Sequence, residues 1–370
     1  MKHLFRLVVV PPLLGVFVSY RTIIAALAAG ALIAGCSQNA VLSQSNASAS
    51  LVQATNSLSV AKPSAGFKAP RSASSKSDQY LFVANKTNYG TGYVTVYDTT
   101  QNNLVTTLTK DVGEPSALGV SPQGYLYVAN QDNRGTVTVY GSKWNVTHTM
   151  NSSILPHSIL FDSANNLYVG GQKYASVFPD ARTPKYKIRG TGGLAVDAAG
   201  NVYISSKHEI DIYQPGKKKN YKSIPLSGTF SFGYLAIDSS GNLYVGSTPY
   251  GQCGSVAVYN TSTDSLEYTI TDGICEPKQI AESPDGNIYV LNANNGSPSV
   301  TVYSPGTTTL LRTVTAGLND SNAVTFDANG DLYVSNVANV TVYAPGSDSV
   351  LRTITDAING SDGVAFGVLK

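Results

Sequence analysis

One phrase of sequence recurs seven times between residues 79 and 370, and it constrains the fold more than any other feature of the chain. Each copy has a short apolar stretch, a turn containing Gly or Asn, and then stretches resembling Leu-Tyr-Val, Val-Thr-Val-Tyr and Leu-Arg-Thr-Ile. An aromatic residue in the second stretch marks the copies, at Phe82, Tyr127, Tyr168, Tyr203, Tyr244, Tyr289 and Tyr333. Successive marks are 45, 41, 35, 41, 45 and 44 residues apart, a period typical of four-stranded propeller blades.

The pattern inside each copy indicates strands and tight turns. In residues 339–343, Val340 and Val342 alternate with Thr341 and Tyr343, as expected for a sheet packed on both sides. Turn residues such as Pro-Asp-Gly at 284–286 separate the stretches. With only 13% charged residues and 23 Tyr, the composition also favours short strands over helices.

The two ends of the repeat region predict how the ring closes. The region begins with a second strand, at residues 80–85, and finishes with a first strand, at residues 363–366. Pairing these two completes one blade and removes the free edges. The sequence therefore predicts an all-β fold, a seven-bladed β-propeller over residues 79–370, closed by its C-terminal strand pairing with the N-terminal blade.

The phrase resembles the YVTN and NHL families of propeller repeats. The likeness is carried by residues 125–130 with 136–140, by residues 284–290, and by residues 326–334. The resemblance implies a propeller fold. Because these propellers serve as enzymes, receptors and passive surface proteins, it implies no single function.

The N-terminal segment is predicted to be a signal peptide over residues 1–35. Lys2, Arg6 and Arg21 precede an apolar run of 13 residues from Ile23 to Gly35, which is too short to span a bilayer. The run ends in Leu-Ile-Ala-Gly-Cys, which resembles the lipobox of bacterial lipoproteins and implies that Cys36 is lipidated. The alternative is a membrane anchor with an incidental Cys.

Residues 36–78 are predicted to be a flexible tether that begins at the lipidated Cys36. The segment is rich in Ser, Ala, Asn and Gln and has no sustained period. Ser37 after the Cys, by resemblance to sorted lipoproteins, favours the outer membrane or cell surface. Removing the signal changes the formal charge from +2 to −1, which does not favour nucleic acid as a partner.

Cys253 and Cys275 are the other cysteines of the chain. They fall in the loop after the second strand of one blade and the loop leaving its fourth strand, which emerge on the same face of a propeller. A disulfide between them suits an exported protein, and two free thiols are the alternative.

The loops leading into the first strands converge at the mouth of a propeller channel, where propeller enzymes have their sites. Aligning the repeats at these loops gives a ring of seven residues: Ser116, His157, Gly192, Gly233, Lys278, Asn322 and Asp362. The five that are not glycine are predicted to form a binding rim.

His157 is one of four candidate catalytic residues, with Glu114, Glu276 and Asp362. It lies in a Pro-His-Ser-Ile stretch that looks like one used by propeller lyases. That resemblance implies a second His or an acid at the ends of neighbouring second strands. Those strand ends carry no acid: Asn85, Asn130, Gly171, Ser206, Ser247, Asn292 and Asn336. A His hydrogen-bonded to a neighbouring loop is the alternative.

The acids near the rim could bind a hard cation such as Ca²⁺, as in propellers similar to gluconolactonases, but no matching motif order is present. Solvated carboxylates are the alternative, and no cofactor or metal is predicted. The acids concerned are Glu114, Glu276, Asp320 and Asp362.

A basic group is expected on the outer strands of the third and fourth blades, able to contact an acidic polymer or lipid headgroups, or simply solvated. It comprises Lys185, Lys187, Arg189, Lys217, Lys218, Lys219 and Lys222.

Taken together, these features favour a binding or scaffolding lipoprotein at the cell envelope, held at the membrane by its lipid. Its further partner is an unidentified protein, glycan or small molecule. The alternative is a propeller lyase or lactonase, and the sequence leans against an enzyme.

Overall fold

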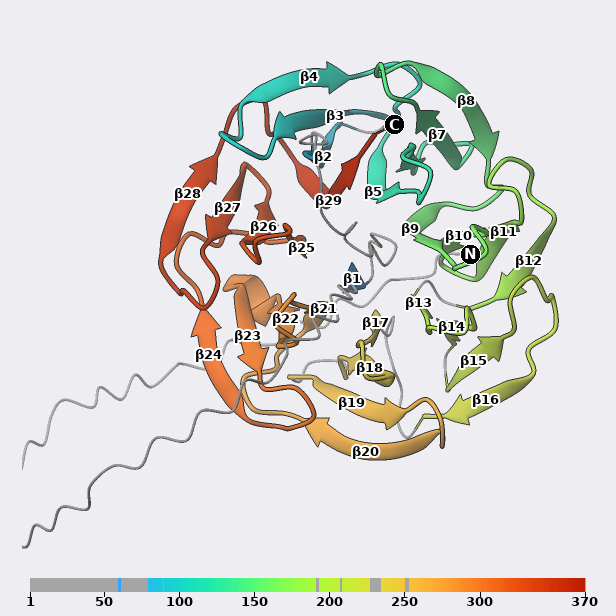
Figure 1. The fold of residues 1–370 in the computed structure, drawn as a ribbon, viewed down its shortest axis with the longest axis vertical. Coiled ribbons are helices and arrows are strands. Elements are labelled where there is room, and N and C mark those ends of the chain that lie inside the picture. The colour runs from blue at the N-terminus through green and yellow to red at the C-terminus, as the bar shows by residue number, and fades with distance from the viewer. Residues whose placement is uncertain are drawn as a thin grey trace, which may run out of the picture. The chain divides into compact units, whose positions relative to one another are not determined.

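The computed structural model describes residues 59–60, 79–88, 90–190, 193–206, 208–226, 234–249 and 253–369. Seven antiparallel sheets stand around a common axis like the blades of a propeller (Figure 1), which confirms the predicted fold. The predicted signal peptide, Cys36 and most of the tether lie outside the described residues. No helix in the described ranges is long and apolar enough to cross a membrane.

Each blade has four strands, the first nearest the axis and the fourth at the rim, and we number the blades from the one that contains the first propeller strand. From the axis outward, blade 1 consists of β29 (Ser361–Val368), β2 (Gln79–Asn88), β3 (Thr91–Asp98) and β4 (Leu104–Leu108). Blade 2 consists of β5 (Pro115–Val120), β6 (Leu126–Asn130), β7 (Thr136–Tyr140) and β8 (Val146–Asn151), and blade 3 of β9 (Pro156–Phe161), β10 (Leu167–Gly171), β11 (Tyr174–Phe178) and β12 (Tyr186–Arg189). Blade 4 consists of β13 (Leu194–Val196), β14 (Val202–Ser205), β15 (Glu209–Tyr213) and β16 (Lys222–Pro225), and blade 5 of β17 (Tyr234–Ile237), β18 (Asn242–Ser247), β19 (Ser255–Asn260) and β20 (Ser265–Ile270). Blade 6 consists of β21 (Pro277–Glu282), β22 (Ile288–Asn292), β23 (Ser299–Tyr303) and β24 (Leu310–Val314), and blade 7 of β25 (Ala323–Phe326), β26 (Leu332–Asn336), β27 (Asn339–Tyr343) and β28 (Val350–Ile354).

Two short elements lie outside this scheme. The two-residue strand β1 (Ser59–Val60) pairs antiparallel with the inner edge of β21, and the 3₁₀ helix η1 (Asn294–Gly296) follows β22.

The ring closes as predicted from its two ends. The last strand, β29, pairs antiparallel with β2, with Leu81 opposite Phe366 and Val83 opposite Val364. The chain termini of the propeller thus share one sheet, and blade 1 has no free inner strand.

Alternation along each strand places side chains in two different inter-blade cores. In β27, Val340 and Val342 pack in a cluster with Leu81 of blade 1, whereas Tyr343 packs with Val302 of blade 6. All four of these β27 and β23 residues are fully buried. Because neighbouring blades cover both faces, third strands such as β7 and β27 are buried along almost their whole length, whereas fourth strands such as β4 and β24 alternate in exposure.

Asparagines at the ends of second strands hold the loops on one face of the ring. Asn130 is fully buried; its Nδ2 donates to Thr138 Oγ1 at 3.1 Å, and its Oδ1 accepts from the Gly113 N–H at 3.2 Å. Asn85, Asn292 and Asn336 bond in the same way to a Thr of the third strand and to an N–H of the preceding loop. These contacts need a donor and an acceptor on one side chain, which explains why no acid stands there.

Candidate functional site at the channel mouth

A cavity of about 220 Å³ lies where the loops leading into the first strands converge. Six of the seven blades contribute to its lining, which consists of Ser116, Gln131, His157, Tyr234, Lys278, Gln279, Asn322 and Asp362. A concave polar pocket shared by many elements is a usual form of ligand site.

The structure brings together all five predicted rim residues. Ser116, His157, Lys278, Asn322 and Asp362 line this one cavity, whereas Gly192 and Gly233 lie outside the described residues. That they bind a ligand stays a prediction.

Several rim residues also join one blade to the next. Ser116 Oγ donates to the Pro156 carbonyl at 2.7 Å, and Asn322 Nδ2 donates to the Ser361 carbonyl at 2.9 Å. Lys278 Nζ lies 3.2 Å from the Ser321 carbonyl of blade 7. The rim is thus held by bonds between blades, and its side chains keep fixed positions around the cavity.

Gln279 forms a further link between blades 6 and 7. Its Nε2 donates to the Val324 carbonyl at 3.0 Å, and its Oε1 accepts from the Val324 N–H at 2.8 Å. The side chain is buried and both polar ends are satisfied by the same residue. Gln279 therefore forms a rigid wall of the cavity.

His157 is held by a residue that sequence reasoning missed. Its Nδ1 lies 2.6 Å from Nε2 of Gln131, the residue that follows β6. Since Gln131 is the first residue beyond a strand end, a comparison extended by one position would have found it. The contact supports the prediction that His157 is hydrogen-bonded to a neighbouring loop.

Tyr234, which like Gln131 and Gln279 was not predicted, brings a phenol next to an acid. Burial, together with the charge of Asp362, raises the pKa of Tyr234. At neutral pH the phenol is therefore protonated and able to donate a hydrogen bond into the cavity. With Lys278 and Asp362 on the same lining, the cavity presents one cation, one carboxylate and several neutral hydrogen-bonding groups.

The predicted acids do not gather at the rim. The Glu114 carboxylate accepts from the Gly90 N–H and lies 3.4 Å from Lys86 Nζ, so it ties blade 1 to blade 2. Glu276 and Asp320 lie in loops and are not part of the cavity lining. Across the described part of the chain, no three His, Cys, Asp or Glu side chains form a group that could hold a metal ion.

The predicted disulfide is present. Cys253, in the loop after β18, is bonded to Cys275, in the loop after β20, across 22 residues of sequence. The bond indicates an oxidising compartment outside the cytoplasm.

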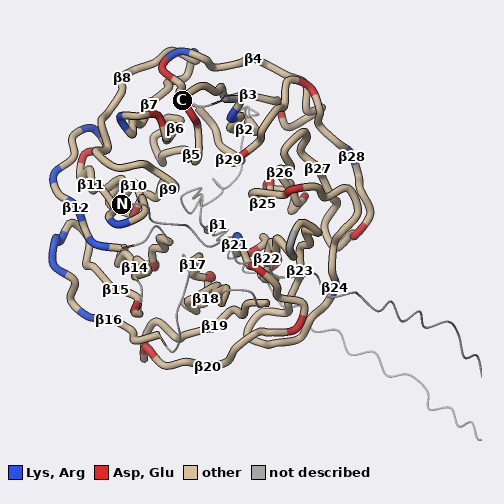
Figure 2. The backbone as a smooth tube through the Cα atoms, turned by 180° about the vertical axis from the view of Figure 1, so that it is seen from behind, with Lys and Arg blue, Asp and Glu red and all other residues tan. Residues whose placement is uncertain are grey.

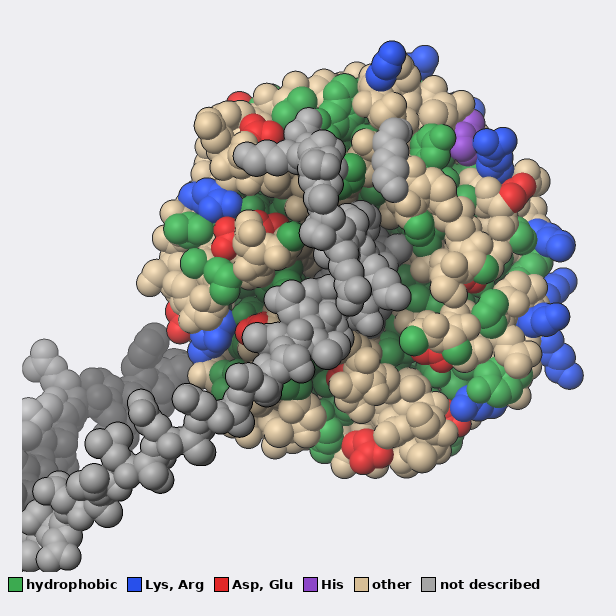
Figure 3. Space-filling view, viewed as in Figure 1, with side chains coloured by type: hydrophobic (Ala, Val, Ile, Leu, Met, Phe, Trp, Pro, Cys, Tyr) green, Lys and Arg blue, Asp and Glu red, His purple; other side chains and the backbone are tan. Residues whose placement is uncertain are grey.

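The basic group lies on the rim of the ring, as expected, along β12, β16 and the turn before β16 (Figures 2 and 3). Lys185, Lys187 and Arg189 are exposed, as are Lys217, Lys218 and Lys219. Lys222 differs, because its Nζ pairs with Asp264 of blade 5 at 2.6 Å. Its charge is therefore part of an inter-blade contact.

Comparison with solved structures shows the fold alone. A protein described as functionally unknown from Desulfotomaculum acetoxidans shares 13% identity at a TM-score of 0.65, over 79% of this chain and 99% of that one. Hydrazine synthase of Kuenenia stuttgartiensis shares 17% identity at 0.59, over 69% and 90%. The WD40 β-propeller domain of Doa1 shares 16% at 0.54, over 73% and 93%.

No family model and no curated protein matches the sequence. The resemblance to YVTN and NHL repeats therefore stays a prediction.

Proposed function

We propose that this protein is a membrane-anchored, extracytoplasmic lipoprotein whose propeller binds a ligand or partner at the cell envelope through the channel-mouth cavity. The observation that carries this proposal is the convergence of the five rim residues on one cavity of about 220 Å³. The propeller fold is consistent with a binding or scaffolding module. The lipobox and tether supply the anchor, and the disulfide supports export.

The lining favours binding over the lyase or lactonase alternative. Of the four candidate catalytic residues, only His157 and Asp362 line the cavity. His157 is already bonded to Gln131, and Glu114 to groups of blade 1. What the lining offers is a fixed pattern of opposite charges and neutral donors and acceptors, which suits a small polar ligand carrying both an anionic and a cationic group.

Ligand capture tests this assignment. The purified protein is incubated with a small-molecule extract of cell envelopes, separated by gel filtration and analysed by mass spectrometry. We expect a compound retained in stoichiometric amount and unchanged, and lost in Lys278→Met, because the substitution removes the cation of the cavity and keeps the length of the side chain. Lys185→Met, on the exposed rim, is the matched control.

Chemical conversion of the retained compound would support the enzyme alternative instead, provided that His157→Ala abolishes it. If the wild-type protein contains one calcium ion per molecule and Asp362→Asn contains none, the cavity holds a calcium site that includes Asp362. Retention of nothing by the wild-type protein would contradict the binding proposal.

Lipid anchoring is tested separately at Cys36. We expect the wild-type protein to incorporate labelled fatty acid and to enter the detergent phase in phase partition, since acyl chains supply the membrane affinity. Cys36→Ser should carry no label and stay in the aqueous phase, whereas a Cys253→Ser, Cys275→Ser variant should be labelled like wild type. Labelling of Cys36→Ser at the wild-type level would be incompatible with a lipid on that residue.

A further inference from the structure

The seven blades share a contact position at their outer edge. On each fourth strand, one residue is paired with the second aliphatic residue of the third strand. These residues are Thr106, His148, Tyr186, Lys222, Tyr268, Arg312 and Arg352.

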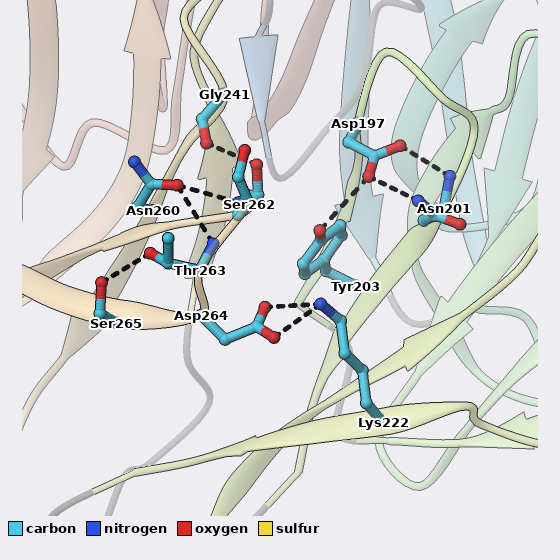
Figure 4. A network of polar contacts seen from close by, with 11 residues as sticks. Asp197, Asn201, Tyr203, Lys222, Gly241, Asn260, Ser262, Thr263, Asp264 and Ser265 are labelled. Atoms are coloured by element: carbon cyan, nitrogen blue, oxygen red, sulfur yellow. Dashed lines mark hydrogen bonds and ion pairs between the residues drawn. The ribbon is translucent and has the colours of Figure 1, made fainter.

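In most blades, a large side chain lies at or near this position. Lys222 reaches Asp264 in the turn of blade 5, below Tyr203 of its own blade (Figure 4). Arg312 donates to Tyr289 Oη and pairs with Asp348 of blade 7 at 3.2 Å.

Blades 7 and 1 have related contacts at this position. Arg352 donates to Tyr333 Oη at 2.7 Å. Where blade 1 has the small Thr106, Trp144 from the turn of blade 2 packs edge-on against Tyr80 at 5.0 Å between ring centroids. In blades 6 and 7 the arginine donates to the hydroxyl of the second-strand tyrosine, and in blades 1, 4 and 6 the contact links adjacent blades.

Blade 2 departs from this arrangement. Its residue is His148, which is shorter than Arg or Lys, and a cavity of about 230 Å³ lies between it and the turn of blade 3. Its lining includes Tyr125, Tyr127, His148, Asn165, Asp180 and Arg182. It is built from β6 and β8 of blade 2 and from loops of blade 3, away from the first-strand loops of the channel mouth.

Two acceptor atoms in this cavity lack partners in the described part of the chain. They are His148 Nε2 and Asn165 Oδ1, both buried. Thr147 Oγ1 donates to the Val139 carbonyl at 3.1 Å and lies 3.0 Å from His148 Nδ1. Because the hydroxyl has a single hydrogen, Nδ1 is the donor in that contact, and the tautomer with its hydrogen on Nδ1 has Nε2 as an acceptor.

Further groups on the lining extend this pattern. Asp180 is fixed by accepting the N–H groups of Thr183 and Arg182, which lower the pKa of its carboxyl, so it is ionised and can accept. Arg182 is an exposed donor, and Tyr125 is 39% exposed, so that part of its ring is open to a ligand. The charges of Asp180 and Arg182 offset each other, which favours neither a strong anion nor a strong cation.

We propose that this cavity between blades 2 and 3 binds a saccharide. A sugar ring has an apolar C–H face that can pack on an aromatic ring. Its hydroxyl groups can donate to the unpartnered His148 Nε2 and Asn165 Oδ1 and to the Asp180 carboxylate, and can accept from Arg182. A ligand rich in O–H donors can pair with these acceptors in place of water. A purely apolar ligand would leave these acceptors unpaired.

The test uses saturation-transfer NMR with three disaccharides, maltose, cellobiose and N,N′-diacetylchitobiose, added to the purified protein. We expect at least one of them to bind. His148→Arg introduces the side chain of blades 6 and 7, which should fill the cavity, donate to Tyr127 and keep the melting temperature at or above that of wild type. Binding should weaken at least tenfold, equivalent to about 1.4 kcal/mol.

Tyr125→Ala should also weaken binding at least tenfold by the same conversion, whereas Tyr174→Ala is the matched control because Tyr174 is similarly exposed, at 45%, on blade 3 and outside the cavity. Lys278→Met should leave saccharide binding unchanged, which separates this site from the channel mouth. The proposal is overturned if none of the three disaccharides binds wild type, or if His148→Arg and Tyr125→Ala bind as wild type does.

Discussion

Replacing both Cys253 and Cys275 by Ser is expected to lower the free energy of unfolding by about 3 kcal/mol, because the bond closes a loop of 22 residues in the unfolded chain. The bond also connects the loop after β18 of blade 5 to the loop that leads into blade 6. Ser is close to Cys in size, so the substitutions remove the covalent link with little change in packing.

Urea unfolding monitored by tyrosine fluorescence and by circular dichroism measures this loss. Both probes should give one transition for wild type and for the variant, with the midpoint of the variant lower. Wild type treated with a reducing agent should match the variant, which controls for the substitutions themselves. Equal midpoints for oxidised wild type and the variant would show that the bond does not stabilise the fold.

The fold was predictable because each blade repeats the same local signals. Turns such as residues 238–241 and the aromatic Tyr244 that follows are read directly from the sequence, and the structure shows why they occur together. Asp238 accepts the Asn242 N–H and side-chain amide at 2.8 Å each, and also the Tyr244 hydroxyl at 3.0 Å. One short motif thus fixes the turn and the buried phenol.

The sites were less predictable because their groups come from different blades. The rim could be predicted by alignment because its residues occupy the same position in each repeat. Tyr234 and Gln131 also line the cavity, but they occupy other positions of the repeat. Glu114 shares the loop position expected of a catalytic acid, yet it bonds to Gly90 and Lys86 of another blade. Only three-dimensional neighbours reveal such pairings.

The cavity at His148 was hidden for a related reason. As a single residue, His148 is an ordinary outer-strand histidine. Its significance depends on comparing it with Lys222, Arg312 and Arg352 at the same strand register, and that register includes a bulge after the paired valine in blades 2, 6 and 7. The repeat itself aligns these residues, but only the structure shows that a cavity lies beside the shorter side chain of His148.

Glu282, at the end of β21, is expected to make the stability of the protein fall as pH rises. The carboxyl is buried and lies against the neighbouring blade, where Ser239 donates to it from its N–H at 2.8 Å and from its hydroxyl at 2.6 Å. Burial is the main cause that raises its pKa from 4.5 to about 7, and the charge of Asp238 adds to the rise. The two hydrogen bonds from Ser239 lower the pKa, but by less than burial raises it.

The direction of the effect follows from proton counting. Between pH 4.5 and pH 7 the folded protein keeps the proton on Glu282 and the unfolded chain has lost it, so unfolding releases a proton and stability decreases with pH. The protonated Glu282 carboxyl makes its full contribution to the free energy of unfolding below pH 4.5. That contribution, about 3 kcal/mol, is lost as pH rises through 7.

Glu282→Gln should remove this dependence. The amide keeps the shape and one acceptor for Ser239 but does not ionise, so the difference in unfolding free energy between variant and wild type should move in favour of the variant by about 3 kcal/mol from pH 4.5 to pH 8. Urea unfolding at half-unit pH steps measures that difference. Glu267→Gln, an exposed site on β20, is the control and should run parallel to wild type. If Glu282→Gln also runs parallel, the carboxyl is ionised in the folded protein and its burial is compensated by groups other than Ser239.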